Sequence, residues 1–134
     1  MNNLNFLLVD DDLDDQEIFQ LALSEVDPDI TCAFANDGIL GINYLRQNEF
    51  RLPDFIFLDL NMPRMGGMEF LKELKKIDAF SHIPVIIYST SAEPLFMKQT
   101  QDLGASGYIV KPSTLRALIQ SLDIFVKEAT DVAN

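Results

Sequence analysis

The feature that most constrains the fold of this chain is a fivefold alternation between short apolar runs and stretches with helical spacing. Apolar runs that do not alternate with polar residues are typical of strands covered on both faces, as in a parallel sheet. Such runs occupy residues 4–9, 55–58, 85–88 and 108–110, and a weaker run over residues 30–34 is typical of an edge strand. The alternation predicts a doubly wound α/β fold with right-handed crossovers.

Three of the intervening stretches place apolar residues at helical spacing, which predicts helices with one face toward the core. The residues expected on these faces are Ile18, Leu21, Ala22 and Val26, then Phe70, Leu71, Leu74 and Ile77, and finally Leu115, Leu118, Ile119, Leu122 and Val126. Weaker patterns predict helices over residues 38–48 and 94–103. The last helix is expected to end near Ala129, so residues 1–134 form one domain with a core over about 4–129 and a short C-terminal tail.

The charge balance bears on the partners of the chain. Its 134 residues include 10 basic and 21 acidic side chains, which gives a net charge of -11. Such an acidic surface repels phosphate backbones and anionic lipids, which argues against direct binding to nucleic acid or membranes. The longest apolar runs are far shorter than the roughly 20 residues of a membrane-spanning helix. The single cysteine, Cys32, is expected to be a buried, inert thiol in a reducing compartment, which favours the cytoplasm.

Polar side chains follow the predicted strands at the points where the strands end. Asp10 and Asp11 follow the first run, Asp59 the third, Ser89 the fourth and Lys111 the fifth. In an open parallel sheet, ligands bind at the carboxyl ends of the strands. If the first and third strands are neighbours, three carboxylates converge and raise each other's pKa unless a cation compensates. Because Mg²⁺ prefers carboxylates together with carbonyl or water oxygens, the sequence predicts a magnesium site at this edge.

The acidic residues after the first run also have a plainer interpretation, in which they cap a helix and favour its dipole. We favour this interpretation for four of them, which are Asp12, Asp14, Asp15 and Glu17. For Asp10 and Asp11 we favour metal binding, because they coincide with two other candidate residues at the same edge of the sheet.

Asp59 is the candidate reacting group. A carboxylate can attack phosphorus to form an acyl phosphate, which is a form of covalent catalysis. A bound metal would neutralise charge on the transferring oxygens, and Lys111 would hold another of these oxygens. Ser89 offers a hydroxyl that can donate to the phosphoryl group once it has arrived, although a role as a helix N-cap or turn residue is an alternative.

Four segments in this order resemble the receiver domains of two-component response regulators, including stand-alone members such as the chemotaxis receiver. They are residues 7–12, residues 59–63 with Gly67, residues 83–90 and residues 104–112. The likeness extends from Leu4 to about Lys127, and the rather long segment 46–53 is similar to that of phytochrome-associated receivers. The resemblance implies a flavodoxin-like (βα)5 fold with a five-stranded parallel sheet of order 2-1-3-4-5.

The resemblance also implies roles for the residues at the sheet edge. Asp59 would be the phosphoacceptor, Asp10 and Asp11 the acidic pair, and Lys111 the lysine of the family. Asn61 would bind Mg²⁺ through its backbone carbonyl, and Mn²⁺ could substitute for Mg²⁺.

Ser89 and Tyr108 match the two switch positions of the family. Ser89 occupies the position of the hydroxyl residue, where threonine is commoner in the family. Tyr108 occupies the position of the aromatic residue whose ring packs inward. An ordinary core aromatic with its hydroxyl at the surface is the alternative for Tyr108. The bond between Lys111 and Pro112 would be cis. His82 lies outside these motifs and is expected to be a surface loop residue rather than a ligand.

The function implied is that of a stand-alone receiver, which takes a phosphoryl group from a phosphohistidine onto Asp59 and signals by a change of shape. Such a chain is not a conventional enzyme, although it assists its own phosphorylation and dephosphorylation. Its partners would be a sensor histidine kinase or a histidine phosphotransfer protein, and a downstream protein. It would act as a monomer or as a phosphorylation-dependent dimer.

Two alternatives come from other functional classes. A Mg²⁺-dependent phosphatase with an aspartyl nucleophile uses a second Asp two residues after the first as acid and base, but Asn61 stands there and cannot shuttle a proton. A degenerate receiver would bind partners without taking phosphate, and the complete set of candidate residues argues against it.

Overall fold

The computed structural model describes residues 3–133 and contains five β-α units in sequence. The strands are β1 (Asn5–Val9), β2 (Thr31–Ala35), β3 (Phe55–Leu58), β4 (Val85–Ser89) and β5 (Gly107–Val110). The helices are α1 (Leu13–Val26), α2 (Gly38–Gln47), α3 (Gly67–Lys76), α4 (Pro94–Asp102) and α5 (Leu115–Ala133). Neighbouring strands are parallel, and their order is β2-β1-β3-β4-β5. The predicted doubly wound, flavodoxin-like α/β fold and its strand order are confirmed.

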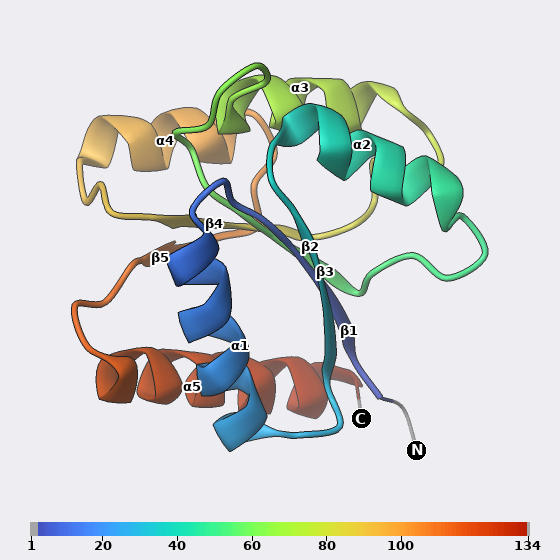
Figure 1. Ribbon diagram of the computed structural model, residues 1–134. Coiled ribbons are helices and arrows are strands. Elements are labelled where there is room, and N and C mark those ends of the chain that lie inside the picture. Colours follow the sequence, from blue (N-terminus) through green and yellow to red (C-terminus); the bar gives the residue numbers. More distant parts are fainter. Residues whose placement is uncertain (1–2, 134) are drawn as a thin grey trace.

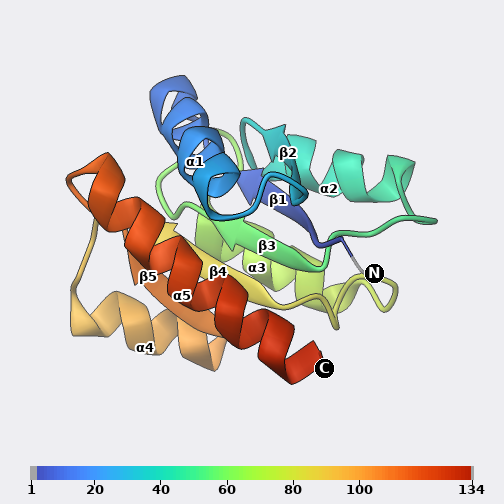
Figure 2. The same ribbon diagram turned by 90° about the horizontal axis from the view of Figure 1, so that it is seen from below.

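The sheet lies between two layers of helices (Figure 1). Helices α2, α3 and α4 cover one face, and α1 and α5 cover the other, as the view from below shows (Figure 2). Each face has its own apolar core. The core beneath α2 and α3 is mainly aliphatic and includes Leu7, Ile56 and Leu71, whereas the core beneath α1 and α5 contains packed rings such as Phe6 and Phe57. Because both faces are covered, the central strands are buried, and they carry the polar residues that follow them to one edge of the sheet.

The predicted face of α1 is partly confirmed, because Ala22 is buried and Val26 packs against the core, but Ile18 and Leu21 do not. Phe19, Ala22 and Leu23 are buried, whereas Ile18 is 41% exposed and Leu21 is 53% exposed. Apolar residues occur on several sides of this helix, so spacing alone did not decide which of them turn toward the sheet. The aromatic ring of Phe19, which packs among the other rings of this core, sets the observed orientation.

The faces predicted for α3 and α5 are largely confirmed. Buried as predicted are Phe70, Leu71, Leu74, Leu118, Leu122 and Val126. Leu115, at the first position of α5, is 42% exposed, because the end of a helix extends past the core that covers its middle. The predicted end of α5 near Ala129 is wrong, since the helix continues to Ala133.

The two edge strands differ in how well the sequence predicted them. Strand β2 lies at one edge, as expected, and β5 lies at the other. The prediction that residues 108–110 are covered on both faces is wrong, because β5 is half-buried and Val110 is 37% exposed. Cys32 in β2 is half-buried and not fully buried as predicted. Desolvation still raises the pKa of its thiol to about 12, which keeps it protonated and unreactive. Within residues 3–133, no helix combines the length and apolar composition needed to cross a membrane.

Candidate functional site

Asp10 and Asp59 follow two neighbouring central strands at the carboxyl edge of the sheet. The Asp59 amide donates to the Val9 carbonyl oxygen at 2.9 Å, and the Asp10 amide donates to the Ala35 carbonyl oxygen at 2.9 Å. Sheet-like hydrogen bonds therefore fix both backbones. The carboxylates of Asp10, Asp11 and Asp59 each offer an oxygen within 4.8 Å of the other two. The predicted convergence of three carboxylates is confirmed.

Burial makes this concentration of negative charge costly. Asp10 is fully buried and Asp59 is 7% exposed, whereas Asp11 faces solvent. Desolvation raises the pKa of Asp59 to about 6, against the attraction of Lys111 and with a further contribution from the two other carboxylates. Burial also raises the pKa of Asp10. Oδ2 of Asp10 accepts no hydrogen bond of good geometry within residues 3–133, and the positively charged group beside it is the Lys111 ammonium. Three converging carboxylates exceed the charge of one ammonium, and such an oxygen-rich cluster fits a hard cation such as Mg²⁺.

The Lys111 ammonium lies among three carboxylates. Its Nζ is 2.8 Å from Asp15 Oδ2, 2.9 Å from Asp10 Oδ2 and 3.7 Å from Asp59 Oδ1. Burial alone would lower the pKa of this ammonium, but the contacts with Asp15 and Asp10 outweigh it, so the pKa is raised. The Lys111 amide donates to the Ser89 carbonyl oxygen at 2.7 Å, which holds the lysine at the ends of β4 and β5. Lys111 therefore carries a permanent positive charge in the pocket.

Asp12 caps α1 as predicted, but the prediction that Asp15 only favours the helix dipole is wrong. The Asp12 carboxylate accepts from the amides of Asp14 and Asp15 at 2.9 and 3.2 Å. These bonds begin α1, and the Asp15 side chain then reaches the Lys111 ammonium. Asp11 precedes the N-cap of α1, so helical spacing does not relate it to Asp15 and gives no sequence signal for this contact. The sequence did not show that Lys111 approaches this side of α1.

Ser89 and Tyr108 contact the same residue of the loop between β4 and α4. The Ser89 hydroxyl, which is buried, accepts from the Ser91 amide at 3.2 Å. The half-buried Tyr108 donates its hydroxyl to the Ser91 carbonyl oxygen at 2.7 Å. Ser89 is thus a turn residue in this structure and not an N-cap, since Glu93 precedes the first turn of α4. The two predicted switch residues are connected through the backbone of Ser91.

The loop between β3 and α3, which carries Asn61, is anchored to the start of α2. The buried carboxylate of Asp37 accepts from the Leu40 amide at 2.9 Å and from Nε of Arg64 at 2.8 Å. A second guanidinium nitrogen of Arg64 contacts the same oxygen. Arg64 has a φ of 63°, which is uncommon outside glycine, and its ion pair with Asp37 holds that conformation. No sequence pattern reveals this pair, because the two residues stand far apart in the chain.

The same loop closes over the backbone of the phosphoacceptor candidate. A Cβ atom at Gly67 would collide with the carbonyl oxygen of Asp59, so only glycine fits there. Asn61 is exposed and lines a hollow beside the site together with Ser89 and Ser91. The metal-binding role of the Asn61 carbonyl stays a prediction.

Two expectations outside the reacting groups have different outcomes. The described residues contain no cis peptide bond, so the expected cis bond between Lys111 and Pro112 is wrong. The trans form is the lower-energy state of such bonds by about 0.5–1 kcal/mol. His82 is exposed in the loop between α3 and β4, as predicted.

Comparison with known proteins identifies relatives along nearly the whole chain. The response regulator receiver domain family matches residues 6–123. The chemotaxis protein CheY-3 of Vibrio cholerae is 31% identical over 121 residues, which is 90% of this chain and 90% of the relative. The phosphorylated cyanobacterial phytochrome response regulator RcpA is 32% identical, covers 92% of this chain and 91% of its own, and superposes with a TM-score of 0.82. The Mn²⁺-bound form of the response regulator Rcp1 is 28% identical, covers 90% and 89% of the two chains, and has a TM-score of 0.77.

Proposed function

This chain belongs to the response regulator receiver family, and we propose that it is a cytoplasmic, stand-alone receiver whose Asp59 accepts a phosphoryl group from a phosphohistidine. The observation that carries the proposal is the setting of Asp59. Its buried carboxylate lies at the end of a central strand, among two further carboxylates, with the Lys111 ammonium 3.7 Å away. Receiver domains are phosphoacceptors and do not turn over a substrate as conventional enzymes do.

In the proposed reaction, a carboxylate oxygen of Asp59 attacks the phosphorus of the phosphohistidine. The new P–O bond forms as the P–N bond breaks, and the imidazole nitrogen keeps the electron pair and takes a proton from water. The Lys111 ammonium attracts an oxygen of the transferring group, and Ser89 can donate its hydroxyl to another. Later a water oxygen attacks the phosphorus, the P–O bond to Asp59 breaks, inorganic phosphate leaves and the carboxylate is restored.

Four groups would hold a Mg²⁺ ion at this site: the carboxylates of Asp10, Asp11 and Asp59 and the carbonyl oxygen of Asn61. The donor set supports this choice, because Mg²⁺ prefers carboxylate and carbonyl oxygens. When bound, the ion supplies positive charge that offsets the charge of the phosphoryl oxygens. The Mn²⁺-bound structure of Rcp1 supports the view that Mn²⁺ can replace Mg²⁺.

The change of shape would begin at Ser91, where the two switch residues meet. An attached phosphoryl group brings about two negative charges and three strong acceptors. If Ser89 turns its hydroxyl toward that group, it releases the Ser91 amide, and the hydroxyl of Tyr108 must follow or leave the Ser91 carbonyl. A shift of this loop would bias a two-state equilibrium by a few kcal/mol, which is the scale of many switches.

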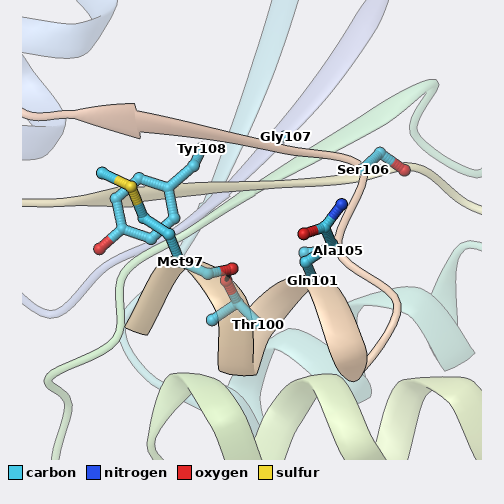
Figure 3. A pocket seen from close by; sticks show the side chains of 7 residues that line it. All are labelled: Met97, Thr100, Gln101, Ala105, Ser106, Gly107 and Tyr108. Atoms are coloured by element: carbon cyan, nitrogen blue, oxygen red, sulfur yellow. Dashed lines mark hydrogen bonds between the residues drawn. The ribbon is translucent and has the colours of Figure 1, made fainter. Parts of the chain in front are cut away.

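The surface over α4 and β5 is where we expect a downstream protein, or a second copy of the chain, to respond to this shift. Figure 3 shows a hollow there, with Met97, Thr100 and Gln101 on α4 and Tyr108 on β5. Because Tyr108 lines the hollow and also bonds to the switch loop, its movement would change the shape of this surface. On the input side, receiver domains partner with histidine kinases, and either a sensor kinase or a phosphotransfer protein would supply the phosphohistidine.

The proposal is tested by incubating the protein with Mg²⁺ and a small phosphodonor such as acetyl phosphate, followed by intact mass spectrometry. We expect one added phosphoryl group on the native chain and none on Asp59→Asn. Asp29→Asn is a matched control, because Asp29 is an exposed aspartate that precedes β2 at the opposite edge of the sheet. Phosphorylation of Asp59→Asn, or none on the native chain, would contradict the proposal.

The same preparation separates the two alternative functions. Many turnovers of an aryl phosphate per protein molecule would support the phosphatase. No spectroscopic change around Asp59 with Mg²⁺ and beryllium fluoride would support a receiver that only binds partners. We expect neither result.

A further inference from the structure

We propose that Asp15 restrains the Lys111 ammonium and thereby weakens the hold of the pocket on a phosphoryl group. Asp15 would be a positioning residue that acts through Lys111 without touching the phosphoryl group itself. This inference rests on the proposed function of Asp59, and the experiment below distinguishes failure of one from failure of the other.

The contacts of the ammonium are unequal. Nζ of Lys111 donates a hydrogen bond of 2.8 Å to Asp15 and lies 2.9 Å from Oδ2 of Asp10, whereas Oδ1 of Asp59 is 3.7 Å away, which is beyond hydrogen-bond distance. The pocket therefore contains the lysine that a phosphoryl group on Asp59 would need, but this lysine is engaged by two other carboxylates, of which Asp15 lies outside the proposed metal-binding set.

The position of Asp15 explains how it holds the lysine toward α1. The Asp12 cap fixes the Asp15 backbone at the first turn of the helix. Asp15 and Lys111 both line a hollow between α1 and the start of α5. Tyr88 lines the same hollow. The ammonium lies 5.2 Å from the centre of the Tyr88 ring, so a second attraction keeps it in place.

A phosphoryl group must compete for this ammonium. It brings about two negative charges to Asp59, and its oxygens need the donor that Asp15 occupies. The Asp15 side chain is 31% exposed, so water screens part of its attraction and the competition is moderate. Replacing Asp15 by Asn removes the charge and keeps the size of the side chain. It takes away one of the two carboxylates that hold Lys111 apart from Asp59, while the contact with Asp10 remains.

The first measurement is the affinity for beryllium fluoride, a stand-in for the phosphoryl group, at a Mg²⁺ concentration that saturates every variant. For Asp15→Asn we expect affinity about 2- to 5-fold tighter than native, the effect of one partly exposed ion pair. Asp14→Asn is the matched control, because Asp14 is the exposed neighbour on the same helical turn and its carboxylate has no contact with Lys111. Asp15→Glu, which restores the charge, should return the affinity toward native.

The second measurement uses Mg²⁺ alone and asks whether Asp15 acts through the lysine. A released ammonium lies closer to Asp59, so Asp15→Asn should weaken Mg²⁺ binding more than Asp14→Asn does. With Lys111→Met as the background, the difference between the two substitutions should shrink to the direct effect of the Asp15 charge on Asp10. A difference as large as in the native background would overturn the inference.

The outcomes separate the two claims. If native protein and Asp14→Asn both fail to bind beryllium fluoride with Mg²⁺, the proposed function of Asp59 is wrong. If both bind and Asp15→Asn binds equally or more weakly, the function stands and the role given to Asp15 is wrong.

Discussion

Two charged clusters lie at the same edge of the sheet, and they differ in charge balance. The anchor consists of Asp37 and Arg64, one anion and one cation, and hydrogen bonds from Arg64 and from an α2 amide outweigh burial and lower the pKa of Asp37. Within the described part of the chain, the pocket contains Asp10, Asp11, Asp15 and Asp59 around one cation, Lys111, and burial raises the pKa of Asp59 to about 6. A balanced cluster is complete as it stands, whereas an unbalanced one fits a further cation.

The anchor serves the pocket, because it ties down the loop between β3 and α3. That loop begins directly after Asp59 and includes Asn61, the predicted carbonyl ligand. The Met65 carbonyl oxygen accepts from the amide of Gly38, which joins the loop to α2 a second time. The anchor thus stabilises the loop and holds Arg64 in its uncommon backbone conformation. The pocket, in contrast, keeps an unfavourable excess of negative charge that its function requires.

The largest expected effect comes from breaking the anchor. Asp37→Ala removes both a helix N-cap and the buried partner of a guanidinium, and we expect it to lower the free energy of unfolding by about 2–4 kcal/mol. Chemical denaturation at neutral pH measures this loss. Asp29→Ala, on an exposed loop, should change stability by less than about 0.5 kcal/mol. Equally small losses of unfolding free energy in Asp37→Ala and Asp29→Ala would show that the anchor contributes nothing to stability.

Removing one carboxylate from the pocket should stabilise the protein, whereas breaking the anchor should destabilise it. Without Mg²⁺ at pH 7, Asp59→Asn should raise the free energy of unfolding by about 1–2 kcal/mol, because the ionised native carboxylate is destabilised by burial. The folded-state pKa of about 6 lies above the unfolded value, so this penalty is absent below about pH 4 and complete above about pH 6. Urea denaturation at pH 4 and pH 7 checks the sign. A destabilised Asp59→Asn at pH 7 would contradict it.

The affinity of the pocket for Mg²⁺ should depend on pH through the same group. Protons compete with Mg²⁺ for Asp59 as the pH falls through about 6, so calorimetric titration should give weaker binding at pH 5 than at pH 7. The expected loss is up to about tenfold per pH unit below the pKa. In Asp59→Asn, this step, the loss of Mg²⁺ affinity as the pH falls through about 6, should disappear. Persistence of the step in that variant would assign it to another carboxylate.

The smallest effect tests the shape of the anchor. Arg64→Lys keeps the positive charge but loses the planar group that contacts Asp37 through two nitrogens. Because Arg64 is 56% exposed, we expect a loss of only about 0.5–1 kcal/mol in thermal or chemical unfolding. Arg51→Lys, at an exposed arginine outside the anchor, should be neutral. A loss as large as that of Asp37→Ala would mean that guanidinium geometry, and not charge, holds the loop.

The pocket was largely predictable because its residues follow directly after apolar runs. Asp10, Asp59 and Lys111 each stand at a strand end, and the doubly wound topology brings those ends together. The contacts of Asp15 and the anchor were not predictable in the same way. They depend on which way side chains point from α1 and on a loop conformation at Arg64 that no local pattern encodes.

The helices show the same limit. The apolar faces of α3 and α5 follow from spacing, because polar residues occupy their other sides. In α1, apolar residues stand on more than one side, so spacing alone does not tell which of them are buried. Packing against the aromatic cluster buries Phe19 and Leu23 and leaves Ile18 and Leu21 exposed.

The most direct test of the central claim is thermal unfolding with increasing Mg²⁺. Ligand binding to the native state raises stability in proportion to the logarithm of ligand excess, so the melting temperature of the native chain should rise steadily above the Mg²⁺ dissociation constant. Asp29→Asn, at an exposed aspartate away from the pocket, should show the same rise, and Asp59→Asn a much smaller one. Equal rises for native and Asp59→Asn, or no rise for the native chain, would contradict a divalent-cation site built on Asp59.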